Sequence, residues 1–260
     1  MGLPNTYTGA VPAAGDGAIV VWSNHGRVFT PPATAQRVEG QRFSAGGERL
    51  WGLSGKVLRE ASFAGSNWYT YLELQAVPDG AGGVVFAAED WNGEEPASRD
   101  VVVQRVSADG ALLWPPDTYI GATTEIEQVD SLTAMPDGGV VVGVARSDGL
   151  TTYLAYLQRL DGNGASVWPQ LTPVGVSPSM QDYATFGLVV GDRLRFVYST
   201  FGPTSYDLHL AEFALDLPIR LAVARRAARS CSTSWRASST CVKPVSSTRS
   251  SASTSRRLTR

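Results

Sequence analysis

The sequence has few of the residues that most catalytic and metal-binding sites require. Its 260 residues include two cysteines and two histidines. Neither His25 nor His209 lies at a spacing typical of a zinc site, and we expect each to have a surface or packing role. There is no Gly-x-Ser-x-Gly nucleophile elbow, no phosphate-binding loop and no Cys-x-x-Cys pair. No apolar run reaches the length of about 18 residues that a membrane-spanning helix needs. We therefore assign no catalytic residue, no metal ligand and no membrane span.

Acidic residues and glycine are absent from the last part of the chain. Residues 1–216 contain all 24 acidic residues and 12 of the 22 basic ones, a net charge of −12. Residues 217–260 contain the other 10 Lys and Arg and no acid. Gly202 is the last of the 27 glycines, and both cysteines, Cys231 and Cys241, lie in the basic part. The composition predicts an acidic globular domain over 1–216, followed by a Ser/Arg/Thr-rich tail of a different kind.

Three interpretations of the tail compete. A shifted reading frame in a GC-rich gene would produce Arg, Ser, Ala and Thr in bulk and would end any repeat abruptly. A native tail of this charge and low hydrophobicity would be disordered, and its basic side chains could contact nucleic acid or acidic surfaces. A disulfide between Cys231 and Cys241 could close a small subdomain. We expect no stable fold after about residue 217, and no nucleic-acid partner for the acidic body.

One motif occurs three times, over residues 41–51, 104–114 and 158–168. Each copy begins with Gln-Arg and an apolar residue, continues through a short turn, and has a glycine four residues before a tryptophan. The recurring positions are Arg42, Arg105 and Arg159, then Gly47, Gly110 and Gly164, then Trp51, Trp114 and Trp168. We expect the tryptophans to fill the space between adjacent sheets, because identical placement in every repeat is what packing requires. Stacking on sugars is the functional alternative.

A second motif recurs in phase with the first. It is an Asp/Gly turn followed by a β-branched run, and its copies begin at Asp16, Asp79, Asp137 and Gly191. Asp-Gly pairs provide the positive φ of tight hairpin turns, and the Val-rich runs between them have strand composition. In the second repeat we expect strands near 68–77, 83–89, 99–107 and 111–120.

Units of four antiparallel strands, repeated every 40 to 60 residues or so, are typical of propeller blades. The sequence predicts an all-β, propeller-like array of about four blades, near 1–58, 59–120, 121–177 and 178–216, with the last one incomplete. Four blades could close a small ring. We favour an arc of a larger propeller, whose exposed sheet edges would invite pairing.

The repeat resembles the tandem repeats of β-propeller-like proteins of bacteria, most of which are uncharacterised secreted or surface proteins. The resemblance covers residues 15–215 or so and brings no catalytic residue with it. It implies an extracellular or cell-envelope location. The first residues lack the basic and apolar regions of a secretory signal. We therefore expect the true start to lie upstream, in a protein that is monomeric or part of a longer chain.

One acidic segment is the first candidate for ligand binding, with the residues Glu89, Asp90, Trp91, Glu94 and Glu95. Paired carboxylates beside an aromatic residue could serve a glycosidase, which needs two of them about 5–10 Å apart. The same oxygens could bind Ca²⁺, the one cofactor that the sequence suggests. The alternative is a solvated turn, which is common in a domain of this charge.

Two functions from different classes fit these observations. The favoured one is a non-catalytic scaffold or binding module of an exported bacterial repeat protein, with a protein or a glycan as partner. The alternative is a glycan-processing propeller enzyme that uses carboxylates on the loops between blades. An enzyme requires acidic and Arg side chains that converge on one face with perturbed pKa values, whereas a module has a symmetric rim.

Overall fold

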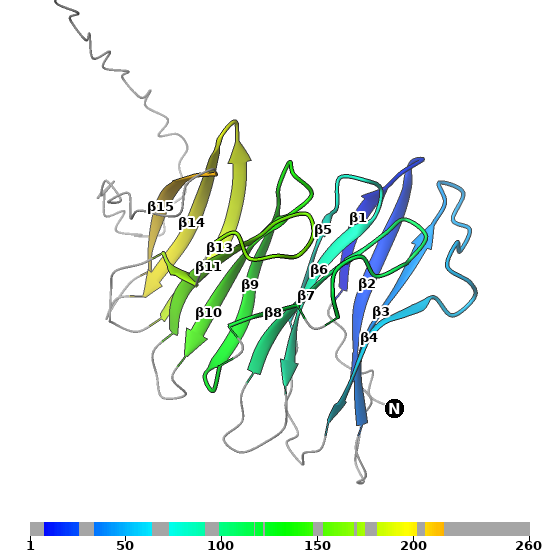
Figure 1. Ribbon diagram of the computed structural model, residues 1–260, viewed down its shortest axis with the longest axis horizontal. Coiled ribbons are helices and arrows are strands. Elements are labelled where there is room, and N and C mark those ends of the chain that lie inside the picture. Colours follow the sequence, from blue (N-terminus) through cyan, green and yellow to red (C-terminus); the bar gives the residue numbers. More distant parts are fainter. Residues whose placement is uncertain are drawn as a thin grey trace, which may run out of the picture. The chain divides into compact units, whose positions relative to one another are not determined.

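The structure is a computed structural model in which the described residues form β-strands and turns, without a helix (Figure 1). The described residues are 8–25, 34–63, 73–91, 99–116, 118–121, 123–147, 153–168, 171–174, 181–201 and 206–215. None of them forms a helix long and apolar enough to cross a membrane. The chain divides into two units, Met1–Ala227 and Ala228–Arg260, and all described residues belong to the first. The predictions for the tail after residue 216, its cysteines included, lie outside the described residues.

The strands form successive antiparallel meanders, called blades 1 to 4 below. Blade 1 comprises β1 (Thr8–Ala13), β2 (Gly17–His25), β3 (Thr34–Phe43) and β4 (Lys56–Phe63). Blade 2 comprises β5 (Leu74–Pro78), β6 (Val84–Trp91), β7 (Arg99–Val106) and β8 (Thr118–Ile120). Blade 3 comprises β9 (Ile126–Ala134), β10 (Val140–Ser147), β11 (Tyr153–Leu160) and β12 (Thr172–Pro173). Blade 4 has β13 (Gln181–Val190), β14 (Arg193–Phe201) and β15 (Tyr206–Ala214).

These meanders confirm the predicted all-β, propeller-like fold of four-stranded blades. The first strands of successive blades, β1, β5, β9 and β13, are in contact with one another. Single parallel residue pairs, Arg99 with Ile126 and Tyr153 with Gln181, also join blade 2 to blade 3 and blade 3 to blade 4. The sheet of blade 1 continues to Phe63, beyond the predicted boundary near residue 58, because β4 pairs with β3 along its whole length.

The core lies between the blades, and this explains why some strands are apolar on both faces. In β6, the even-numbered side chains from Val84 to Ala88 pack with blade 1. The odd-numbered Val85 and Ala87 pack with residues of blade 3, such as Val140 and Val142. Consecutive rather than alternate residues are therefore buried, as in any strand that is covered on both sides.

Tight turns occupy one end of the blades, called the turn end below. In the repeated motif the chain turns at Gly47, Gly110 and Gly164, which have φ values of 84°, 81° and 82°. This left-handed conformation suits glycine, because a Cβ is disfavoured there. The Asp161-Gly162 pair is an exception to the expectation that Asp-Gly pairs provide the positive φ of the turns. The positive φ falls on Gly164, which is the residue equivalent to Gly110, and not on Gly162.

Each repeated Gln fixes the chain segment that carries the following Trp. Gln104 Oε1 accepts hydrogen bonds from the backbone N–H groups of Arg105 (2.9 Å) and Trp114 (3.0 Å). Its Nε2 donates to the Trp114 carbonyl at 3.3 Å. Gln41 Oε1 likewise accepts from the N–H groups of Arg42 and Trp51, but its Nε2 donates to the Gly52 carbonyl. The side chain thereby satisfies backbone groups at a place where no neighbouring strand does so.

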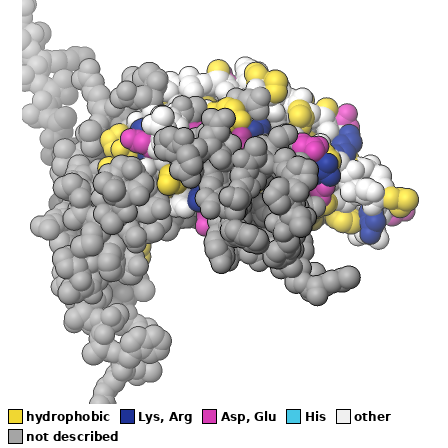
Figure 2. Space-filling model, turned by 90° about the horizontal axis from the view of Figure 1, so that it is seen from below, with side chains coloured by type: hydrophobic (Ala, Val, Ile, Leu, Met, Phe, Trp, Pro, Cys, Tyr) yellow, Lys and Arg dark blue, Asp and Glu magenta, His cyan; other side chains and the backbone are white. Residues whose placement is uncertain are grey.

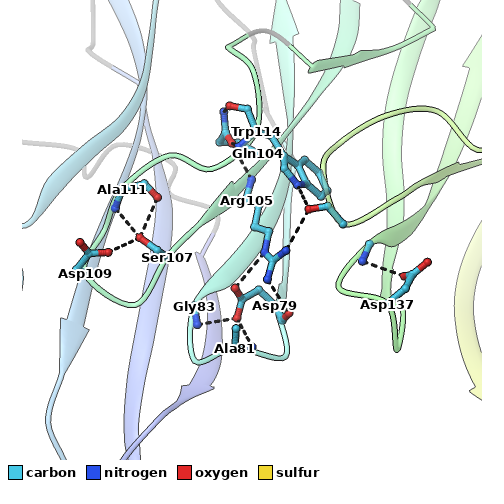
Figure 3. Close-up of polar contacts among 12 residues, drawn as sticks. Asp79, Ala81, Gly83, Gln104, Arg105, Ser107, Asp109, Ala111, Trp114 and Asp137 are labelled. Atoms are coloured by element: carbon cyan, nitrogen blue, oxygen red, sulfur yellow. Dashed lines mark hydrogen bonds and ion pairs between the residues drawn. The ribbon is translucent and has the colours of Figure 1, made fainter.

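The repeated Trp and Arg connect one blade to the next. Trp51 Nε1 and Arg42 Nη1 donate to the Ala108 carbonyl in blade 2, at 3.0 and 2.9 Å. Trp114 Nε1 and Arg105 Nη1 donate to the Gly162 carbonyl in blade 3, at 2.8 and 3.1 Å. Figure 3 shows Arg105 between the Asp79 turn and this carbonyl, with the Trp114 ring beside it.

The third copy of this contact is only partly made. Arg159 Nη1 donates to the carbonyl of Leu215, which lies at the position equivalent to Ala108 and Gly162. Trp168 is buried, but its Nε1 has no hydrogen-bond partner among the described residues. In the fourth repeat the Gln-Arg positions hold Ala211 and Glu212. The turn end is therefore a repeated structural device that changes at blade 4.

Candidate functional site

Charged side chains gather at the other end of blades 2 and 3, called the loop end below. Here β6 and β10 end and β7 and β9 begin, and antiparallel pairing sets their terminal residues opposite one another. Asp90 pairs with Asp100, and Glu127 pairs with Arg146. The charged cluster contains Glu73, Glu89, Asp90, Asp100, Glu125 and Glu127, together with Arg59, Arg99 and Arg146. In Figure 2, seen from below relative to Figure 1, carboxylates and basic side chains lie next to each other at several places.

The predicted acidic segment is only partly a loop. Glu89 and Asp90 lie in β6, which continues to Trp91. Glu89 is 3% exposed, so it is not part of a solvated turn. The Trp91 side chain, Glu94 and Glu95 lie outside the described residues, and whether all five residues form one site remains a prediction.

Asp90 belongs to a compact polar group formed by blades 1 and 2. Its Oδ2 accepts hydrogen bonds from Arg59 Nη2 at 2.5 Å and from the Tyr119 hydroxyl at 2.7 Å. Arg59 also donates to the Tyr119 hydroxyl at 2.7 Å. Burial and the neighbouring Asp90 raise the pKa of Tyr119 to about 12. The phenol thus stays protonated and acts as a donor to the carboxylate.

Glu89 is a buried acid whose neutralisation is incomplete. Its Oε2 lies 3.3 Å from Arg99 Nη1, while its Oε1 has no hydrogen-bond partner among the described residues. Burial raises the pKa of Glu89 to about 8, because the effect of Arg99 is too small to compensate for desolvation, and Glu73 repels the charge as well. Burial also raises the pKa of Glu73.

Glu127 is fully buried at the start of blade 3. Its Oε1 accepts a hydrogen bond from the Thr123 hydroxyl at 2.8 Å and lies 3.4 Å from Arg146 Nε. Its Oε2 has no hydrogen-bond partner among the described residues. Burial raises the pKa of Glu127 to about 7, opposed by the Thr123 hydrogen bond and increased by the nearby charge of Asp100. Arg146 is shared, since it also forms an ion pair with the more exposed Glu125.

Gly121 brings the backbone close to this carboxyl. A Cβ at Gly121 would lie 2.7 Å from Glu127 Oε1, and the residue has a φ of 86°. Both observations favour glycine at this position. The close approach places the Glu127 carboxyl directly behind the chain segment that borders the pocket.

The pocket lies between blades 2 and 3 and has a volume of about 420 Å³. It is lined by Tyr119, Ile120, Gly121, Thr123, Arg146, Gln158, Ser166 and Leu171. Tyr119 links it to Asp90, while Thr123 and Arg146 link it to Glu127. A volume of this size is in the range of small-ligand sites.

Asp100 connects the two acidic groups. Burial and the neighbouring Asp90 raise the pKa of Asp100, whose own charge in turn raises that of Glu127. The loop end thus combines a buried, largely neutral acid with carboxylates held by Arg and Tyr. A buried acid of raised pKa, such as Glu127, can support general acid catalysis.

No group of three His, Cys, Asp or Glu side chains within the described ranges is arranged to hold a metal ion. The Ca²⁺ prediction for the segment around Glu94 and Glu95 lies outside these ranges and is untested.

The sequence analysis missed several members of this site, and two of them carried a usable signal. Glu127 has the parity of Val129, Ser131 and Thr133, the buried side of β9. An acid on the buried side of an alternating strand indicates a specialised environment. Gly121 follows a strand directly and precedes this acid. For Arg59, Tyr119 and Arg146 the sequence contains no comparable signal.

No family model matches the sequence, and neither does any curated protein. Among solved structures, the chain is similar to an alpha-L-arabinanase of Penicillium chrysogenum in complex with arabinobiose, with 14% identity and a TM-score of 0.47. That alignment covers 79% of this chain and 61% of the arabinanase. It is also similar to an alpha-L-arabinofuranosidase of Fusarium graminearum in complex with an iminosugar inhibitor, with 12% identity and a TM-score of 0.46. This second alignment covers 81% of this chain and 62% of that one.

The chain thus spans about three fifths of the length of these two structures. At such identities the similarity is one of fold. Both structures are of enzymes that are named for glycan substrates, and neither is a scaffold. On this finding the expectation of a non-catalytic scaffold or binding module is withdrawn.

Proposed function

We propose that this chain is a glycan-processing enzyme that cleaves a glycosidic bond by general acid catalysis at the loop end of blades 2 and 3. The observation that carries the proposal is Glu127. It is a fully buried carboxyl group with one unpartnered oxygen, and two of its polar contacts, Thr123 and Arg146, line an open polar pocket.

Glu127 has the properties of a proton donor. A carboxyl group with a pKa of about 7 keeps its proton in a large fraction of molecules near neutral pH. Hydrolysis of a glycosidic bond needs such an acid to protonate the leaving oxygen. Glu127 does not itself line the pocket, so we assign the Thr123 hydroxyl, which contacts Glu127 Oε1 and lines the pocket, as the relay that passes the proton to the substrate.

A second carboxylate must stabilise the positive charge that develops on the sugar ring. We assign this role to Asp90, because Arg59 and Tyr119 both donate hydrogen bonds to its Oδ2. Tyr119, which contacts Asp90, and Thr123, which contacts Glu127, both line the pocket.

We further propose that the enzyme acts outside the cell or in the cell envelope of a bacterium, as the repeat resemblance implies. Glycans of extracellular polymers would then be its partners. Detection of the chain in the secreted or envelope fraction of its native cells would support this location.

The test of the function is the release of reducing ends from a panel of polysaccharides. The panel contains arabinan, xylan, β-glucan, chitosan, chitin and polygalacturonate. We expect cleavage of at least one member, and a fall of about 10²-fold or more in kcat for Glu127→Gln, the usual effect of removing a general acid. Glu60→Gln is the matched control, because Glu60 is exposed, is paired with Arg37 and does not line the pocket. Full activity of Glu127→Gln, or no cleavage of any polysaccharide, would contradict the proposal.

A further inference from the structure

The guanidinium of Arg146 is shared by two acids of very different burial. Among the described residues that line the pocket, Arg146 alone is charged. It forms an ion pair with Glu125, and its Nε lies 3.4 Å from Glu127 Oε1. The Glu125 side chain is 40% exposed, whereas that of Glu127 is fully buried. One cation thus lies between an exposed carboxylate and a buried carboxyl group.

The backbone sets both acids within reach of Arg146. Glu127 in β9 pairs directly with Arg146 in β10. Glu125 immediately precedes β9 and lies two residues before Glu127. Side chains two residues apart along an extended chain point to the same side. The two acids therefore compete for one guanidinium.

This competition leaves Glu127 without a complete ion pair. Arg146 Nε has no hydrogen-bond partner among the described residues, so its approach to Glu127 is a charge contact only. Arg146 Nη2 donates instead to the Thr123 hydroxyl, at 3.4 Å, and the Glu125 backbone N–H donates to the same hydroxyl at 3.1 Å. A carboxylate gripped by both arms of an Arg gains two charge-assisted hydrogen bonds, which favour its ionised form. Glu127 has no such grip.

From this geometry we infer that Glu125 is a positioning residue of the site. Its ion pair holds Arg146 on the exposed side and prevents the guanidinium from pairing fully with Glu127. The inference rests on the proposed function for the role of Glu127 as proton donor, and adds the residue that preserves this role. A Glu127 carboxylate fully paired with Arg146 would have no proton to give. Glu125 does not line the pocket, so it acts through Arg146.

The charged groups that face Glu127 come from three places: Asp100 in β7, Arg146 in β10 and Glu125 before β9. Burial, together with the charges of Asp100 and Glu125, raises the pKa of Glu127 to about 7, against the Thr123 hydrogen bond and the charge of Arg146. Removing the Glu125 carboxylate takes away a negative charge and also releases Arg146. Both changes lower the pKa of Glu127, so the experiment has to separate them.

The experiment is an NMR titration of the full chain and of Glu125→Gln without substrate. We expect the midpoint of the Glu127 carboxyl to fall by about one pH unit or more in Glu125→Gln, the usual effect of an opposite charge that gains contact with a carboxyl group. The nitrogen signal of Arg146 Nε separates release from loss of charge. Its change through the Glu127 titration should be larger in Glu125→Gln than in the unaltered chain, because Arg146 then pairs with Glu127.

Two further variants complete the test. In an Arg146→Gln background, Glu125→Gln should shift the Glu127 midpoint far less, since no guanidinium remains to be released. Glu60→Gln is the matched control, because Glu60 is also an exposed carboxylate paired with an Arg, Arg37, and does not line the pocket. It should leave the Glu127 midpoint and the Arg146 signal unchanged.

An unchanged Glu127 midpoint in Glu125→Gln, an unchanged response of Arg146 Nε, or an equal shift with and without Arg146 would overturn the inference. The first two measurements need only a substitution at an exposed position, so they do not depend on whether Arg146→Gln folds. If the shifts are found but no polysaccharide is cleaved, the proposed function fails and the role of Glu125 in holding Arg146 stands. If cleavage depends on Glu127 but the shifts are absent, the inference alone fails. In an active chain, the upper pH limit of kcat should fall in Glu125→Gln together with the Glu127 midpoint.

Discussion

Replacing Glu89 by Gln should change how the stability of the protein depends on pH. The carboxyl has an ordinary pKa of 4.5, and burial raises it to about 8 in the folded protein. Between these two values the folded state holds a proton that the unfolded state has lost. The free energy of unfolding therefore falls as pH rises through this window, by about 1.4 kcal/mol per pH unit for this one group. Above pH 8 or so the group is ionised in both states and its contribution no longer changes.

The whole window amounts to about 5 kcal/mol for Glu89, a large part of the stability of a typical domain. Gln has nearly the same shape as the protonated acid and cannot ionise. We expect Glu89→Gln to differ little from the unaltered protein near pH 5 and to be clearly more stable than it at pH 9. The difference between the two proteins isolates Glu89 from the other titrating groups, Glu127 included.

Urea unfolding at pH 5, 6, 7, 8 and 9, followed by the fluorescence of the seven tryptophans, measures this difference. Glu60→Gln is the control, since Glu60 is exposed and paired with Arg37, and it should retain the pH dependence of the unaltered protein. If Glu89→Gln and the unaltered protein show the same dependence on pH, Glu89 is not a neutral buried acid and the reasoning fails.

Three further substitutions test the two ends of the blades. Trp114→Phe should lower the free energy of unfolding by about 1–3 kcal/mol, because it removes the hydrogen bond to Gly162. Trp168→Phe should lower it less, because Trp168 Nε1 has no partner among the described residues. Urea unfolding decides between them, and an equal cost would show that this hydrogen bond contributes nothing. Arg105→Lys should cost about 1–3 kcal/mol by the same assay, because it loses the simultaneous contacts to Asp79 and Gly162, whereas the exposed Arg195→Lys should stay within about 0.5 kcal/mol. Gly121→Ala should destabilise the protein more than Gly52→Ala, since both glycines have a φ of 86° but only the first would set a Cβ against Glu127. Similar thermal midpoints for these two variants would refute the proposed close packing of Gly121 on the acid.

The repeated motif made the fold predictable. Strands expected near 83–89 and 99–107 are found as Val84–Trp91 and Arg99–Val106, because a β-branched run between turns leaves little conformational choice. The strand expected over 111–120 is reduced to Thr118–Ile120. The earlier residues instead follow the Gln104 side chain, which takes the place of a neighbouring strand. A side chain that substitutes for backbone pairing cannot be distinguished from a strand by periodicity.

The site was harder to predict, for a different physical reason. Its members come from six separate strands and three blades, so no local spacing connects Asp90 with Arg59 or Glu127 with Arg146. The acidic segment pointed to Glu89 and Asp90 as members of an exposed loop, whereas both residues lie in β6. Burial, which is what sets the pKa of Glu89, depends on blades that lie on both sides of β6. Repetition along the chain therefore reveals the turn end, whereas the loop end arises where the repeats differ.

The catalytic role of the loop end is tested most directly by a titration of the Glu127 carboxyl in the full chain by carbon NMR. The Glu127 signal is assigned by its absence from Glu127→Gln. We expect it to titrate near pH 7, well above the ordinary value of 4.5, as a buried proton donor beside the pocket must. A midpoint close to 4.5 would mean that the group is an ordinary ionised carboxylate, and the catalytic assignment of this end of the blades would be wrong.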